Sequence, residues 1–298
     1  MPDTHHHEKI SCASRHARMV ACDSDGCVFD VMDLKHKECF CPAFIKHFQL
    51  QRCARQAREV WEFVNLHSRT RGSNRFKAAG LALKLLSVHP EVAATASGAG
   101  FMELGRLQDF LANTGALGEP ALLRAIGETR DPALRAMLDW TREVNAAVAA
   151  MCHGLGPFAG AAEGLRHAAR HADVVVVSQA PRETLVNEWT HAGLAGDTAF
   201  IAGQEFGGKA SQIRQAIKDH YPADRVLVVG DAPGDQEAAA MVGAKFFPIN
   251  PGSETTSWRH FVEEGFPRFL RDEFDAAYQG RLNAAFDKTL PSAPPWLQ

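Results

Sequence analysis

Two aspartates near the start of the chain, Asp23 and Asp25, have the spacing of a nucleophile and an acid that act on one substrate. They follow a short apolar run and precede Gly26, which permits a sharp turn, so both carboxylates can face one site. One carboxylate can attack phosphorus, while the other protonates the leaving oxygen and later deprotonates water. Because two negative groups repel a phosphate, this chemistry needs a cation, and Mg²⁺ is a hard ion that suits carboxylate ligands.

Three further signals lie downstream, each at a boundary of a predicted strand or helix. Asp231 and Asp235 stand in the run Gly-Asp-Ala-Pro-Gly-Asp and offer additional acidic metal ligands. Ser178 ends an apolar run and can hold phosphate oxygens together with backbone N–H groups, and Lys209 can neutralise the nucleophile and the transferred phosphoryl group. Each signal alone is weak, but their order and their positions together indicate phosphoryl transfer.

Buried strands must position these residues. Continuous β-branched runs at 18–23, 173–178 and 225–231, with weaker ones at 198–202 and 244–249, are typical of strands that are covered on both faces. Helical stretches at 160–171, 182–192 and 209–218 separate them, which predicts an α/β fold with a Rossmann-like parallel sheet. Functional loops of such a sheet lie at the carboxyl ends of its strands, where Asp23, Ser178 and Asp231 fall.

The pattern changes after the first strand, where apolar residues recur at three- and four-residue steps and strand signals vanish. We therefore expect an all-helical cap domain at 32–152, inserted between core segments at 1–31 and 153–252. Asp131 and Pro132 have the pattern of an N-cap and a first helical residue. A C-terminal helical tail at 253–298, with a helical stretch at 258–286, is expected to pack on the core. It could also cover a partner subunit, so a homodimer stays open.

These motifs resemble those of the haloacid dehalogenase (HAD) superfamily of hydrolases, across about 15–31 and 155–250, and the helical insertion matches the family's cap by position. The resemblance implies that Asp23 forms an aspartyl-phosphate and that Asp25 is the general acid and base. It also implies that Asp25 lends Mg²⁺ a backbone carbonyl, so that the metal ligands comprise Asp23, Asp25, Asp231 and Asp235, the last supporting either this ligand shell or Lys209. Ser178 would bind phosphate and Lys209 would steady nucleophile and phosphate.

Three functions remain after this comparison. The second carboxylate, Asp25, argues against the dehalogenases and phosphonate-cleaving members, which lack it. The leading prediction is a phosphatase that hydrolyses a small phosphorylated metabolite. A phosphomutase of the β-phosphoglucomutase type has a similar core, and a binding protein that keeps the fold without activity is the alternative from another class.

A basic stretch in the insertion is the candidate for substrate binding. Arg69, Arg71 and Arg75 lie where a predicted helix breaks at Gly72, and they could steer an anionic substrate or simply line a solvated face. The whole chain has a formal net charge of −3, which offers no general attraction to nucleic acid or an anionic membrane.

The cysteines and the hydropathy indicate the cellular compartment of the protein. An odd count of seven cysteines without paired CxxC motifs predicts free thiols in a reducing cytosol. No apolar run reaches the roughly 20 residues that span a bilayer, and no apolar signal core precedes the first motif. We therefore expect a cytoplasmic protein without a membrane partner.

Overall fold

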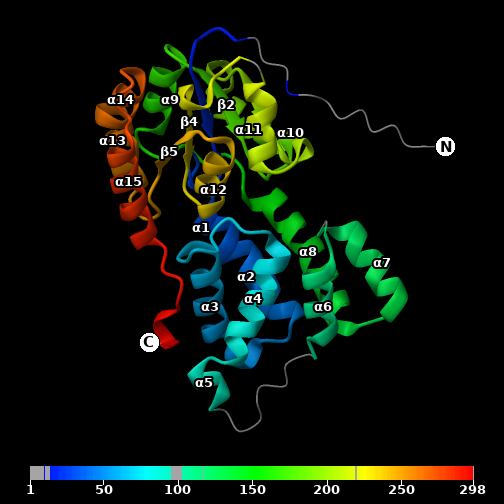
Figure 1. The fold of residues 1–298 in the computed structure, drawn as a ribbon. Helices are drawn as coiled ribbons and strands as arrows, with labels where there is room; N and C mark the ends of the chain where they lie inside the picture. Colours follow the sequence, from blue (N-terminus) through cyan, green and yellow to red (C-terminus); the bar gives the residue numbers. More distant parts are fainter. Residues whose placement is uncertain (1–9, 11–13, 95–102, 116, 219, 298) are drawn as a thin grey trace, which may run out of the picture. The chain divides into compact units, whose positions relative to one another are not determined.

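The computed structural model describes residues 10, 14–94, 103–115, 117–218 and 220–297. It divides into two compact units (Figure 1). Unit 1 combines Met1–Val31 with Gly154–Thr289, and unit 2 combines Met32–His153 with Leu290–Gln298. The chain therefore passes between the units at three points, after Val31, after His153 and after Thr289.

Unit 1 is built on a parallel sheet of five strands with the order β3-β2-β1-β4-β5. The strands are β1 (Met19–Cys22), β2 (Asp173–Val177), β3 (Phe200–Ala202), β4 (Val226–Gly230) and β5 (Lys245–Pro248). In the register, Met19 lies between Asp173 and Val226. The α/β fold with a parallel sheet that the sequence predicts is thus confirmed.

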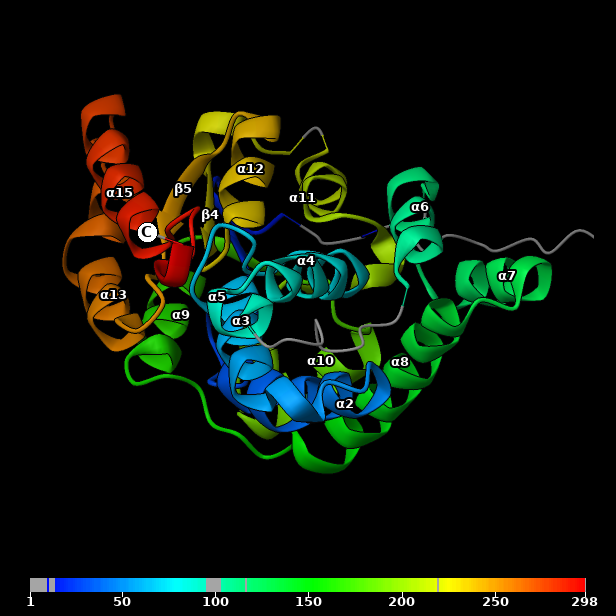
Figure 2. The same cartoon turned by 90° about the horizontal axis from the view of Figure 1, so that it is seen from below.

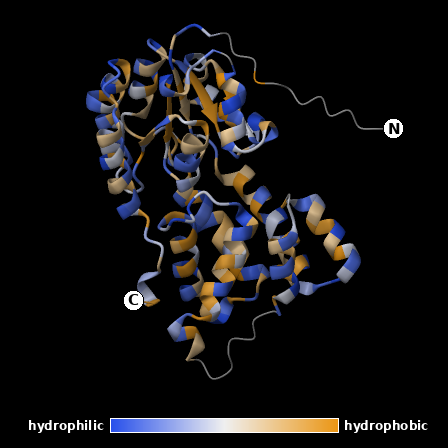
Figure 3. Ribbon diagram, viewed as in Figure 1, coloured by the Kyte–Doolittle hydropathy of each residue, from blue (hydrophilic) through white to orange (hydrophobic). Residues whose placement is uncertain are grey.

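The strands are buried because their residues are apolar on both faces. Every residue of β1, β2 and β4 is buried, and these strands are among the most apolar segments in Figure 3. The core of unit 1 gathers Val20, Val174, Val176, Leu227 and Val229 with rings from the later helices. A parallel sheet needs this cover because helices pack on both of its faces.

Helices surround this sheet, and α11 and α12 pack side by side. Figure 2 shows α12 and α9 on opposite sides of the strands. The α-helices of unit 1 are α9 (Ala161–Ala169), α10 (Arg182–His191), α11 (Lys209–Ile217), α12 (Pro233–Val242), α13 (Glu254–His260), α14 (Phe266–Leu270) and α15 (Ala276–Thr289). Short helical turns are η3 (Ala195–Asp197), η4 (Gln204–Phe206), η5 (Ala223–Arg225) and the π-helix η6 (Phe261–Gly265).

The described part of unit 2 consists of helices and loops without a strand. Its helices are α1 (Met32–Leu34), the π-helix η1 (Lys35–Phe40), α2 (Cys41–His47), η2 (Gln51–Cys53), α3 (Ala54–Leu66), α4 (Arg75–Ser87), α5 (Pro90–Ala93), α6 (Gly105–Asn113), α7 (Glu119–Thr129), α8 (Pro132–Met151) and η7 (Pro295–Leu297). The start of α8 follows the predicted signal, since Asp131 accepts hydrogen bonds from the N–H groups of Ala133 and Leu134.

The C-terminal tail differs from the prediction in two respects. The helical stretch expected at 258–286 is interrupted between α14 and α15, where Asp272 has a φ of 61°. The tail was expected to pack on the core throughout, but Leu290–Gln298 groups with unit 2. There the Trp296 ring lies 5.4 Å from the ring centroids of both Phe63 and His89, and its apolar surface accounts for this placement.

Two further observations concern the described residues of both units. The six cysteines that the structure describes are free thiols, at positions 22, 27, 39, 41, 53 and 152. Among the described residues, no helix combines the length and apolar character that crossing a bilayer requires.

Candidate active site

The predicted chemical groups of unit 1 follow three neighbouring strands. Asp23 comes directly after β1, Ser178 after β2 and Asp231 after β4. Backbone hydrogen bonds continue the sheet at these positions, since Asp23 N–H donates to the Val229 carbonyl at 2.9 Å and Ser178 N–H donates to the Ala202 carbonyl at 3.1 Å. Because parallel strands end at one edge, the three side chains are brought to the same edge of the sheet.

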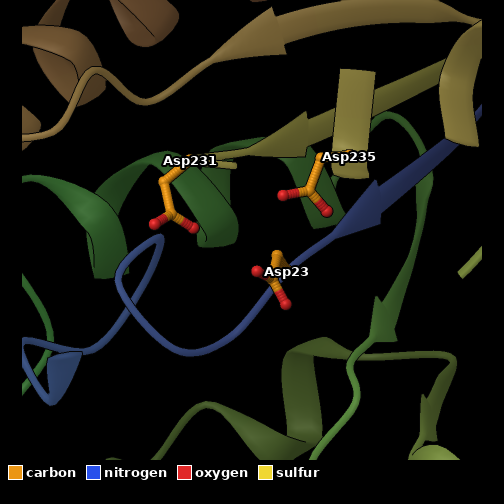
Figure 4. A group of neighbouring side chains, drawn as sticks. All are labelled: Asp23, Asp231 and Asp235. Carbon is orange, nitrogen blue, oxygen red and sulfur yellow. The ribbon is translucent and has the colours of Figure 1, made fainter. Parts of the chain in front are cut away.

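Three buried carboxylates gather at this edge. Asp23, Asp231 and Asp235 each offer an oxygen within 4.8 Å of the others, and each side chain lies in the interior. Figure 4 shows the three carboxylates around a common space. Like charges in such proximity are costly to bury, so this group is a candidate metal centre. The Asp25 carboxylate does not belong to this group. The contact that Asp25 is expected to make with the metal uses its backbone carbonyl instead.

The first turn of α12 holds Asp235 in place. One oxygen of Asp235 accepts a hydrogen bond from Ala232 N–H at 3.1 Å, and Pro233 occupies the first turn, where a missing N–H has no cost. Gly230 is required for this approach, because a Cβ there would collide with the Asp235 carboxylate. The run from Gly230 to Asp235 is therefore a structural unit as well as a source of ligands.

Lys209 links two of the three carboxylates. Its Nζ lies 2.8 Å from Asp23 Oδ2 and 2.6 Å from Asp235 Oδ1. Lys209 begins α11, after a turn in which Gly207 has a φ of 87°, a conformation that favours glycine. The structure thus brings together the predicted nucleophile and the predicted neutralising lysine.

Burial and charge set the protonation of these groups. Burial raises the pKa of Asp23 to about 6, with Lys209 acting against the rise and Asp231 adding to it. Burial likewise raises the pKa of Asp235 to about 6, again opposed by Lys209. For Lys209, burial alone would lower the pKa, but the two carboxylates outweigh it and the pKa lies above its ordinary value. Lys209 therefore stays charged, and Asp23 is mostly ionised at neutral pH.

Ser178 is held by an interaction that the sequence did not predict. Its hydroxyl oxygen accepts a hydrogen bond from Ala180 N–H at 3.2 Å. The side-chain amide of Gln212, which is fully buried, donates to the carbonyls of Ser178, Gly203 and Gly207. Gln212 thereby ties the loops after β2 and β3 to the start of α11. A glutamine in the first turn of a helix gives no signal for such a role, because it usually faces solvent.

The turn that carries Asp25 is closed by local hydrogen bonds. Gly26 has a φ of 78°, its N–H donates to the Phe29 carbonyl, and Val28 N–H donates to the Ser24 carbonyl. The Ser24 hydroxyl accepts a hydrogen bond from the indole N–H of Trp189 at 3.0 Å. Asp25 is half-buried in this turn, two residues beyond Asp23.

The three predicted substrate-binding arginines all belong to unit 2, in different environments. Arg69 is exposed, and its backbone N–H donates to the Pro291 carbonyl. Arg71 is buried and donates to the Leu66 carbonyl at 3.1 Å. Arg75 is half-buried and donates to Asn145 Oδ1 at 2.7 Å. The alternative of a wholly solvated basic face does not fit Arg71 and Arg75.

Comparisons with known proteins give similarities at the level of structure. No protein-family model matches the chain, and no curated protein sequence matches it. A haloacid dehalogenase-like hydrolase from Xanthomonas campestris matches with 14% identity over 92% of this chain and 99% of that chain, with a TM-score of 0.48. CbbY from Rhodobacter sphaeroides, solved with phosphate, matches with 14% identity over 77% of this chain and 84% of that chain, with a TM-score of 0.39.

A third match is L-2-haloacid dehalogenase from Xanthobacter autotrophicus, with 14% identity over 83% of both chains and a TM-score of 0.38. Two of these solved structures, those from Xanthomonas campestris and Xanthobacter autotrophicus, are named for the haloacid dehalogenases that the motifs resemble. At such identities and TM-scores they describe a similarity of structure only.

Proposed function

We propose that this protein is a member of the HAD superfamily and a Mg²⁺-dependent phosphatase that hydrolyses a small phosphomonoester through an aspartyl-phosphate on Asp23. The observation that carries the proposal is the contact of Lys209 with Asp23 and Asp235 beside the Asp231 carboxylate. A nucleophilic carboxylate, a cationic side chain and further acidic ligands are the parts that phosphoryl transfer requires.

The carboxylates fit a hard divalent cation. Asp23, Asp231 and Asp235 supply oxygen atoms, which Mg²⁺ prefers, and their mutual distances allow shared coordination. Their burial supports the same assignment, since the charged forms of Asp23 and Asp235 are destabilised in the free protein, as their raised pKa values indicate. Bound there, Mg²⁺ would offset the negative charge of the phosphate and of the carboxylates that face it.

The side chains then divide the reaction into two steps. Asp23 attacks phosphorus and the bond to the leaving oxygen breaks, while Asp25 donates a proton to that oxygen. In the second step Asp25 takes a proton from water, the water oxygen attacks phosphorus, and the bond to Asp23 breaks to release inorganic phosphate. Lys209 holds Asp23 in its ionised form and stabilises charge on the phosphoryl group, while Ser178 binds a phosphate oxygen.

The proposed substrate is a small phosphorylated metabolite. Arg69, Arg71 and Arg75 would contribute positive charge to its binding. The proposal includes neither nucleic acid nor a membrane as partner, and it places the protein in the cytoplasm, as its free thiols favour.

Release of phosphate from a panel of phosphorylated metabolites tests the proposal. With Mg²⁺, the wild-type protein should release inorganic phosphate from at least one compound, and EDTA should abolish this release. Asp23→Asn should lose nearly all turnover, because an amide cannot form the acyl phosphate. Asp224→Asn, which changes an exposed aspartate of unit 1, is the matched control and should keep full activity.

Trapping the intermediate separates the mechanism from alternatives. When the protein is denatured during turnover of a substrate labelled in its phosphoryl group, label should remain on the protein, and hydroxylamine should remove it. Asp23→Asn should carry no label. Full activity in Asp23→Asn would refute the mechanism. Interconversion of sugar phosphates without net release of phosphate would identify a phosphomutase instead, and no turnover of either kind would favour a binding protein.

A further inference from the structure

The loop at 24–29, here called the Asp25 loop, follows directly after the proposed nucleophile. Ser24, Cys27 and Phe29 are 0% exposed, whereas Asp25 is half-buried. The loop therefore runs through the interior of unit 1 on both sides of Asp25. Polar groups of a buried backbone need partners inside the protein, because water cannot reach them.

The two carboxylates of the proposed reaction are anchored in different ways. Asp23 continues the sheet, since its N–H donates to the Val229 carbonyl at 2.9 Å. Asp25 lies beyond the sheet. The far end of its loop is attached to unit 1 where Phe158 N–H donates to the Val28 carbonyl at 2.8 Å. The place of Asp25 therefore depends on what holds the loop between these two points.

Two indole rings hold the Asp25 loop, one on each side of Asp25. The indole N–H of Trp189, in α10, donates to the Ser24 hydroxyl at 3.0 Å. The indole N–H of Trp258, in α13, donates to the Cys27 carbonyl at 2.8 Å. Both rings are 0% exposed and belong to one core, and the two helices are labelled in Figures 1 and 2. These hydrogen bonds are therefore shielded from water, which would otherwise compete for the same groups.

The ring of Trp258 is closely packed. Helix α13 packs on α9, and a Cβ on Gly164 of α9 would lie 2.8 Å from Cε3 of the Trp258 ring. A larger residue at 164 would therefore collide with the ring. The Phe261 ring meets the indole edge-on, with 5.3 Å between the ring centroids. An indole held in this way gives the loop that it contacts a defined position.

We propose that Trp258 is a positioning residue, which sets the place of Asp25 through its hydrogen bond to the Cys27 carbonyl. The C-terminal tail thereby contributes to the reaction through α13, although Trp258 follows Cys27 by 231 residues in the chain. The inference rests on the proposed function, in which Asp25 donates a proton to the leaving oxygen. Because proton transfer requires the acid within hydrogen-bonding distance of that oxygen, a small displacement of the loop slows it.

The alternative is that the Trp258 hydrogen bond stabilises the fold only, since a buried indole N–H needs an acceptor in any case. The leaving group of the substrate separates the two roles. An alkoxide is a poor leaving group and needs a proton from the acid, whereas p-nitrophenolate leaves without one. A displaced Asp25 therefore slows hydrolysis of an alkyl phosphate and spares p-nitrophenyl phosphate, whereas a loss of folded protein affects both equally.

The test compares kcat/KM of the wild-type protein and Trp258→Phe, with Mg²⁺, for an alkyl phosphate from the metabolite panel and for p-nitrophenyl phosphate. Trp258→Phe removes the indole N–H and keeps an aromatic ring. We expect kcat/KM to fall about tenfold for the alkyl phosphate and less than about twofold for p-nitrophenyl phosphate. Inhibition by inorganic phosphate should change less than about twofold, because Ser178 and Lys209 lie outside the Asp25 loop.

Two control variants change the same core without touching the Asp25 loop. Tyr278→Phe removes a hydrogen bond of the tail, which joins the Tyr278 hydroxyl and His260 Nε2 at 3.0 Å. Phe266→Leu removes ring volume beside Phe261. Both variants should leave the ratio of the two kcat/KM values unchanged, even where they lower Tm.

Hydrogen exchange of the peptide that covers 24–31 reports on the loop in the full-length protein without any substrate. Trp258→Phe should raise exchange there, because Gly26, Val28 and Phe29 N–H groups are bonded within the loop, and Tyr278→Phe should not. Unchanged exchange in Trp258→Phe, or equal losses of kcat/KM for the two substrates, would overturn the proposal. Absence of turnover in the wild-type protein would instead refute the proposed function, and with it the role of Trp258 in the reaction, while exchange would still show whether Trp258 holds the loop.

Discussion

Replacing Lys209 by methionine would remove the positive charge that bridges Asp23 and Asp235 while keeping most of the side-chain volume. In metal-free protein this leaves two buried carboxylates without the ammonium that lies 2.8 and 2.6 Å from them. Breaking a buried ion pair by removing one partner costs about 3–5 kcal/mol, so we expect a loss of this size in the free energy of unfolding at about pH 8.

The size of the loss should depend on pH. An acid whose pKa is higher in the folded than in the unfolded chain binds its proton more tightly when folded, so its contribution to stability rises as the pH falls. For Asp23 in the wild-type protein, the pH window in which this stability is gained runs from about 6 down to 3.8, the ordinary pKa of the group. The rise in pKa corresponds to about 3 kcal/mol. Without Lys209 the pKa rises further, so the window opens at higher pH and the variant recovers stability earlier on acidification.

Native-state hydrogen exchange of peptides that cover β1 and β4 measures this effect in unit 1 alone. The difference between wild type and Lys209→Met should be largest near pH 8 and clearly smaller near pH 5. Lys288→Met, at an exposed position of α15, is the matched control and should differ little from wild type at either pH. A loss below about 1 kcal/mol at pH 8, or a loss that does not change with pH, would refute the electrostatic reasoning.

Three other expectations follow, two from the carboxylate cluster and one from the contacts of Trp296. Mg²⁺ at a hundredfold excess over its dissociation constant should stabilise the protein by about 2.7 kcal/mol, seen as a rise in Tm that Asp231→Asn abolishes and Asp224→Asn retains. Mg²⁺ affinity, measured by calorimetry, should fall as the pH drops below about 6, because protons then compete for Asp23; affinity unchanged at pH 5 would contradict this. Trp296→Ala should destabilise unit 2 by about 2 kcal/mol, because the half-buried ring loses its apolar contacts, and hydrogen exchange of α3 measures this loss. Leu297→Ala, at a 49% exposed position, is the control and should have little effect.

The sheet and the location of the site could be predicted because both depend on local pattern. Runs of valine such as β2 are apolar on both faces, and only a parallel sheet covered by helices buries them in that way. Once the strands are parallel, the residues that follow them meet at one edge, so Asp23, Ser178 and Asp231 did not have to be close in sequence. This part of the prediction required no knowledge of side-chain packing.

The interactions that hold the site together could not be predicted in the same way. The sequence left open whether Asp235 supports a metal or Lys209, because the choice depends on how closely α11 and α12 approach. The role of Gln212 depends on three carbonyls from separate loops, and no local pattern marks them. Likewise, Trp258 looks like an ordinary core residue until the structure shows that its indole N–H donates to the Cys27 carbonyl.

The end of the chain shows most clearly where pattern fails. Residues 290–298 contain three prolines and no helical period, and the expectation that they pack on the core with the rest of the tail was wrong. Their place in unit 2 depends on contacts with distant residues, since Leu290 is buried and Trp296 packs on Phe63 and His89. Prolines reduce the conformational entropy that such a segment loses on docking, so a few apolar contacts suffice to hold it. The tail therefore makes a third covalent connection between the units, in addition to the two that an inserted domain requires.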